Sequence, residues 1–105
     1  MRDRLLAGLR EHIRRCTESG DTSMISSLDA GYEADALVGP GTGFDAEAYH
    51  AAGTVRWLRY RAAAPGEGIA DLAAALRLFG AVLDAGAPYD VPAPMRLILE
   101  CRGDA

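Results

Sequence analysis

The side chains in this sequence that could do chemistry are two histidines and two cysteines. Two His and two Cys can hold zinc, and a Cys beside a His can act as a nucleophile. His12 and Cys16 lie four residues apart, on one face of a helix, but His50 and Cys101 lie far from them in the chain. No pair has the C-x-x-C spacing that makes a zinc prediction specific. The sequence therefore predicts no metal ligand, no cofactor and no catalytic residue. A small helical enzyme, or a bundle that binds a ligand or metal through this His and Cys set, is the alternative function.

The glycine-rich segment at residues 39–43, Gly-Pro-Gly-Thr-Gly, is a second place to look for chemistry, because such loops can bind phosphate. A P-loop needs a lysine after its last glycine, and a dinucleotide-binding loop needs a preceding strand. The chain contains no lysine, and Phe44 follows the last glycine. We therefore predict a turn between two helical hairpins.

A run of arginines and aromatic residues is the best candidate for a binding surface. Arginine, tryptophan and tyrosine supply much of the binding energy at protein interfaces. The sequence leaves open whether the two aromatics belong to the core instead, since large rings bury the most area. The predicted function is a non-catalytic protein–protein interaction or oligomerisation module. The candidate partner-binding residues are Arg56, Trp57, Arg59, Tyr60 and Arg61.

These residues end a predicted helix that starts after Asp45. The Asp45 carboxylate can accept from free amides of the first turn, and Phe44 and Tyr49 have the spacing of a hydrophobic staple. Gly53 costs about 1 kcal/mol relative to Ala inside a helix, so we expect another helix to approach closely there. Two apolar stripes are typical of a helix packed on both sides. One stripe contains Ala48, Ala51, Ala52, Val55, Leu58 and Ala62, and the other contains Tyr49, Gly53, Trp57 and Tyr60.

A second helix is predicted after the Pro-Gly turn at residues 65–68. Gly86, with Pro88 after it, indicates where this helix ends. Two helices joined by a short turn form an αα-hairpin, which we place at residues 44–86. The apolar face of the second helix contains Ile69, Leu72, Ala75, Leu76, Phe79, Val82 and Leu83.

The hairpin resembles a tetratricopeptide-type (TPR-like) repeat. Ala75, Phe79 and Val82 have the second-helix spacing of such repeats, and Pro88 lies one place after their closing proline. The spacing from Ala52 to the Pro-Gly turn and on to Ala75 is similar to degenerate repeats in actinobacterial proteins. Those proteins often carry a CHAT-type caspase-like protease domain downstream. The resemblance implies the repeat part of a larger actinobacterial protein, and it carries over no catalytic residue because no protease domain is present in this sequence.

Further helices are predicted on both sides of the hairpin. Residues 2–17 have a leucine face opposite an arginine face, and residues 23–38 form a weaker helix that Gly31 interrupts. Together they make a first hairpin at residues 1–38. Residues 91–101 form a C-terminal helix that caps the stack. No strand pattern is visible. The predicted fold is all-α, with four to five helices in an αα-hairpin (TPR-like) stack that forms a single domain over residues 1–105.

Charge and composition limit the function classes. A net charge of −4 argues against a nucleic-acid partner. No apolar segment approaches the roughly 20 residues that span a membrane, and no signal peptide is visible. Two cysteines are too few for a secreted disulfide scaffold. We therefore expect a cytoplasmic protein without a membrane partner.

The first helix is a candidate for self-association. Residues 1–18 contain five arginines and three acidic residues, whereas the rest of the chain is acidic. The leucine face of this first helix could pack on the hairpin of a second copy or fold back on its own chain. A short repeat stack has exposed edges, and two-fold dimers are the commonest oligomers. The expected partner is therefore another protein or the chain itself, in a homodimer.

Overall fold

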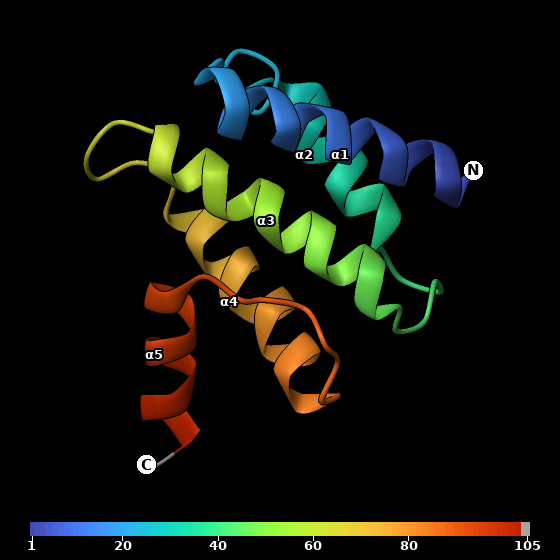
Figure 1. Ribbon diagram of the computed structural model, residues 1–105, viewed down its shortest axis with the longest axis vertical. Coiled ribbons are helices and arrows are strands. Elements are labelled where there is room, and N and C mark those ends of the chain that lie inside the picture. The colour runs from blue at the N-terminus through green and yellow to red at the C-terminus, as the bar shows by residue number, and fades with distance from the viewer. Residues whose placement is uncertain (104–105) are drawn as a thin grey trace.

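Five helices arranged around the predicted hairpin make up the structure (Figure 1). The computed structural model describes the backbone of residues 1–103 and the side chains of residues 1–101. The all-α class is confirmed, and these described residues form no strand. None of the helices in this part of the chain combines the length and apolarity needed to cross a membrane. The helices are α1 (Arg2–Ser19), α2 (Leu28–Leu37), α3 (Ala46–Ala62), α4 (Ile69–Asp84) and α5 (Ala93–Gly103).

The start of α3 has the predicted local structure. Asp45 has an extended backbone, and its Oδ1 accepts from the amide of Ala48 at 3.3 Å. The rings of Phe44 and Tyr49 meet edge to face with centroids 4.8 Å apart. The cap and the staple together fix the direction in which the chain enters the helix.

Helix α3 is packed on both sides, as its two apolar stripes predict. It contacts α1 and α2 on one side and α4 on the other (Figure 1). Ala52 and Val55 are fully buried. A Cβ atom at Gly53 would lie 3.0 Å from Cε1 of Phe79 on α4. The close helix approach expected at this glycine is therefore present, and a side chain at this position would require the Phe79 ring to shift.

Helix α1 lies against its own chain. Its leucine face is buried on α2 and α3, with Leu9 completely inaccessible. Arg2 bonds Asp45 at 2.6 Å and Glu47 at 2.7 Å, and Arg10 bonds Glu47 at 2.6 Å. Hydrogen bonds from Arg2 lower the pKa of both carboxyl groups. The basic helix thus pairs with acidic residues of the same chain, and its leucines are not available to a second copy.

Helix α2 begins later than the sequence pattern indicates. Residues 23–26 form a turn, and the hydroxyl of Ser27 caps the helix by accepting from the amide of Ala30 at 3.2 Å. The prediction of a helix from residue 23 is therefore wrong, because the cap is Ser27 and the helix begins five residues later than predicted, at Leu28. Gly31 does not interrupt α2 but lies inside it, where a Cβ would come within 3.4 Å of the Arg59 guanidinium.

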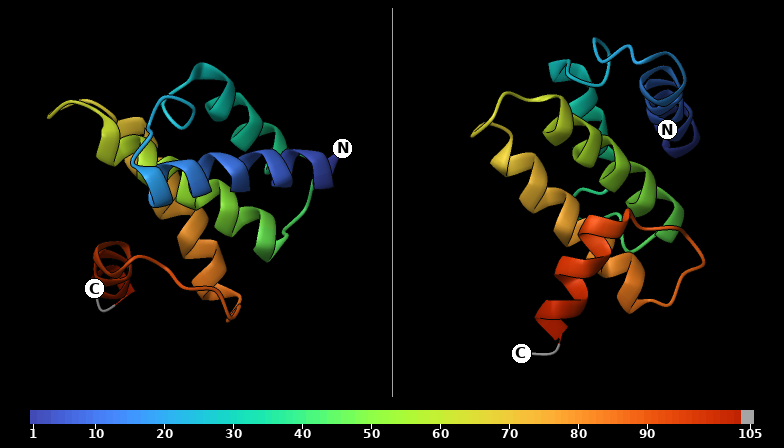
Figure 2. Two further views of the ribbon diagram at one scale, coloured as in Figure 1. Left: turned by 45° about the horizontal axis from the view of Figure 1, so that its top comes forward. Right: turned by 60° about the vertical axis from the view of Figure 1, so that its left-hand side comes forward.

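Helix α5 packs on α4 at the edge of the molecule (Figure 2). It begins at Ala93, two residues later than predicted. Val91 and Met95 are buried against Ala75 and Phe79 in a second apolar cluster. The α4–α5 connection starts at Gly86, whose φ of 65° is left-handed and favours glycine.

Candidate functional site

Two of the candidate binding residues, Arg56 and Arg59, lie in an interior polar network. Both donate to Oδ1 of Asp71 on α4, at 2.7 Å and 3.1 Å respectively. Arg56 also bonds Asp35 on α2 at 2.6 Å, and Arg59 donates to the carbonyls of Ile25 and Ser27 at 3.0 Å and 2.5 Å. The network joins α3 to α4, to the last turn of α2 and to the segment just before α2.

Three side chains of this network are mostly removed from water, whereas that of Asp35 is 65% exposed. Those of Arg56, Arg59 and Asp71 are 14%, 15% and 16% exposed. Partial burial lowers the pKa of Arg56, but Asp71 and Asp35 outweigh it, so the net pKa is raised and the group stays charged. Their donors are used within the chain, so these two arginines hold helices together and offer little to a partner.

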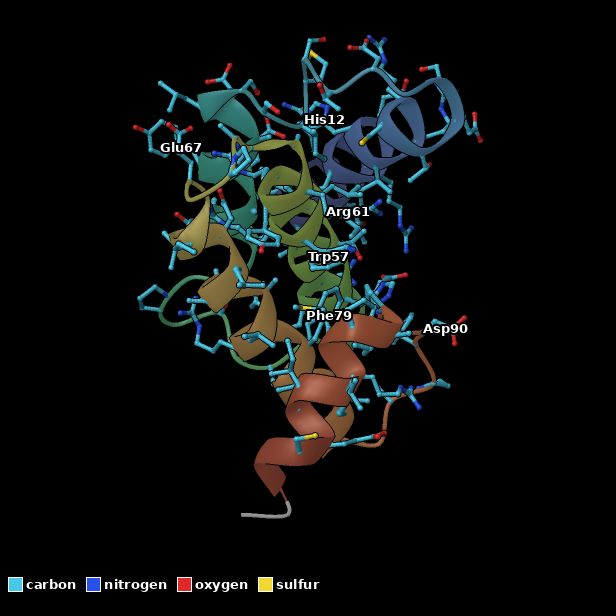
Figure 3. The ribbon with its side chains drawn as sticks, turned by 90° about the vertical axis from the view of Figure 1, so that its left-hand side faces the viewer. His12, Trp57, Arg61, Glu67, Phe79 and Asp90 are labelled. Carbon is cyan, nitrogen blue, oxygen red and sulfur yellow. The ribbon has the colours of Figure 1, made fainter. Side chains whose placement is uncertain are left out.

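The other three candidate residues, Trp57, Tyr60 and Arg61, form a partly exposed cluster. The rings of Trp57 and Tyr60 stack with centroids 5.9 Å apart, and the Arg61 guanidinium lies 5.9 Å from the Trp57 ring. Figure 3 shows Trp57 and Arg61 on the same side of α3, between α1 and α5. Trp57 also packs against the apolar cluster beneath α5. It is therefore both a core residue and a surface residue.

Two separate hollows lie along the boundary between α1 and α3, which we call the α1–α3 seam, and Arg61 of the cluster lines one of them. At one end, Leu58 and Arg61 face Cys16 and Thr17 around a hollow of about 420 Å³. At the other end, a hollow of about 310 Å³ lies between Arg10, Ile13 and Glu47, with Ala51, Thr54, His50 and Tyr89 completing its lining. The seam has an apolar floor and charged ends.

His50 on α3 contacts the segment that follows α4. Its Nε2 donates to the carbonyl of Asp90 at 2.7 Å, which assigns the proton to Nε2. Its ring stacks on Tyr89 with centroids 5.1 Å apart and meets Phe79 edge to face. His50 therefore has a structural position at the edge of the seam.

The four His and Cys residues do not converge. His12 is buried between α1 and α2, with Nε2 3.3 Å from Oε2 of Glu33, and its Nδ1 has no partner among the described residues. Cys16 is half-buried on α1, whereas Cys101 is exposed on α5. In the part of the chain that the structure describes, no group of three or more His, Cys, Asp or Glu side chains could hold a metal ion.

Sequence reasoning missed the role of Asp71. The sequence analysis did not single it out, yet it is the shared acceptor of the network. A signal was available: Arg59 and Asp71 both lie about one helical turn from the loop at residues 63–68 that joins α3 to α4. Residues placed in this way around a hairpin turn face each other across antiparallel helices.

Comparison of the chain with protein-family models, with curated proteins and with solved structures finds no match in any of the three.

Proposed function

We propose that this chain is a non-catalytic protein-interaction module that receives a segment of a partner protein along the α1–α3 seam. The partly exposed cluster of Trp57, Tyr60 and Arg61 anchors that segment. Its ring stack and guanidinium are the residue types that dominate interface energies. The observation that carries the proposal is the hollow beside Arg61, which is open to a side chain from outside.

The charge of the seam indicates the chemistry of the partner. Arg61 has no ion pair among the described side chains, in contrast to Arg10, which bonds Glu47. An acidic side chain can therefore pair with Arg61 without displacing an existing bond. Leu58 and Cys16 line the same hollow and suit a neighbouring apolar side chain. The proposed partner segment carries an acidic residue next to an apolar one.

A selection from a random peptide library displayed on phage tests this proposal. Wild-type protein should enrich peptides with an acidic residue beside an apolar residue. Arg61→Glu should lose at least tenfold in affinity for the enriched peptides. A glutamate at this position repels the acidic residue of the peptide, which Arg61 attracts. Arg77→Glu on α4 is the matched control, because Arg77 is also exposed and has no ion pair among the described side chains.

Two results would contradict the proposal. One is a selection that enriches no peptide family. The other is a family of peptides whose affinity is the same for wild type and Arg61→Glu, which would place the binding surface elsewhere.

A further inference from the structure

Helix α5 has an apolar side that the described residues of its own chain leave exposed. Met95 is fully buried on α4, whereas Leu97 is 63% exposed and Ile98 is 44% exposed. Cys101, one turn beyond Leu97, is exposed as well. At 100° per residue, Leu97 points almost directly away from the buried side of the helix. Figure 2 shows α5 at the periphery of the fold.

Two residues of opposite charge lie along one edge of this apolar side of α5, and we call this edge the flank. Arg96 and Glu100 lie four residues apart, next to Leu97, and both are exposed. Neither has an ion pair among the residues that the structure describes, although most other arginines do. The flank is therefore a pair of unused charges about 6 Å apart along the helix axis.

The order of these charges is self-complementary. If two copies of α5 pair antiparallel about a two-fold axis near residue 98, the same flank of each helix lies on the same side of the pair. Arg96 of one copy is then level with Glu100 of the other, and the contact occurs twice. Leu97 meets its own copy across the axis with a stagger of about 3 Å. In a parallel pair, opposite flanks would meet and the charges would not pair.

We propose that α5 is a self-association surface on which a second copy of this chain docks antiparallel. The helix of 11 residues is about 16 Å long, so the contact is small and the dimer is weak. This surface is distinct from the α1–α3 seam, and it differs from the dimer expected at the sequence level, which used the leucines of helix 1. Those leucines are buried in their own chain.

Sedimentation equilibrium of the full chain in reducing buffer, over a wide concentration series, tests the proposal. Wild type should pass from monomer to dimer as concentration rises. Leu97→Glu should raise the dimer dissociation constant at least tenfold, because it sets two carboxylates against each other at the centre of the contact. Tyr32→Glu is the matched control: Tyr32 is 67% exposed on α2, and its replacement should leave the dissociation constant unchanged.

Charge reversal tests the antiparallel register. Arg96→Glu and Glu100→Arg should each weaken the dimer about three- to tenfold, since each replaces two attractive contacts by two repulsive ones. An equimolar mixture of these two variants should form heterodimers at least as stable as the wild-type dimer. The double variant should recover self-association for the same reason.

Three outcomes would overturn the proposal. A constant monomer mass at all concentrations removes the dimer. A dimer that is unaffected by Leu97→Glu, with circular dichroism showing an intact fold, uses another surface. A dimer that Leu97→Glu weakens but whose charge variants do not restore one another in the mixture is not antiparallel.

Discussion

Arg56 donates from Nη1 to Oδ1 of Asp71 at 2.7 Å, and this contact crosses from α3 to α4 in the interior of the hairpin. The same oxygen also accepts from Arg59. One carboxylate therefore balances two guanidinium groups that are largely withdrawn from water. Without Asp71, Arg56 keeps its bond to Asp35, whose side chain is 65% exposed, and Arg59 keeps its bonds to the carbonyls of Ile25 and Ser27. Arg59 then has no carboxylate partner among the described residues, and leaving a largely desolvated charge in this way costs more than the ion pair itself contributes.

Asp71→Ala should lower the free energy of unfolding by about 2–4 kcal/mol, because two mostly buried arginines lose their shared acceptor. Urea unfolding followed by circular dichroism measures this. Asp84→Ala on the same helix is the control, since Asp84 is exposed and should change stability by no more than about 0.5 kcal/mol. Equal effects of the two substitutions would mean that the network is not a source of stability.

Gly53→Ala should destabilise the protein by about 1–3 kcal/mol even though alanine is the better helix former. The added Cβ would lie 3.0 Å from the Phe79 ring, and overpacking a close-packed core outweighs the gain in helix propensity. Gly80→Ala is the control. A Cβ there would be 3.4 Å from a methyl group of Leu99, at the end of a flexible side chain, so this change should be neutral or stabilising.

Acid should loosen the docking of α1. The pKa values of Asp45 and Glu47 are lowered from ordinary values of 3.8 and 4.5, mainly by Arg2. At pH values between the lowered and the ordinary pKa values, the folded state therefore binds fewer protons than the unfolded state. The stability from these contacts is complete above the ordinary values and is lost as pH falls through the lowered ones.

The test of this pH dependence is the melting temperature measured from neutral to acid pH. Arg2→Ala should show a shallower fall on the acid side than wild type, whereas Arg4→Ala should follow wild type. Arg4 is exposed and has no ion pair within the described residues. An unchanged acid slope in Arg2→Ala would show that these ion pairs are not the groups that titrate.

Much of the local structure followed from short-range patterns. Asp45 could be identified as a cap because capping involves atoms only three residues apart. Gly53 indicated a close approach because glycine inside a helix needs a packing reason. The start of α2 was predicted five residues too early, since serines stand at both positions 23 and 27 and either side chain can cap a helix. Ile25 decided between them: it is fully buried in the turn before the helix, a position that periodicity alone does not reveal.

The sequence by itself determined that this protein is all-α, where its central hairpin turns, and which residues share each helix face. These properties depend on backbone hydrogen bonds and on a repeat of 3.6 residues, both of which are local. Tertiary structure alone decided what each face meets. The sequence does not distinguish Arg56 and Arg59 from Arg61. In the structure the first two form ion pairs with Asp71, whereas Arg61 lines a hollow of the α1–α3 seam. The burial of a charged side chain depends on partners far away in the chain, so spacing along one helix cannot predict it.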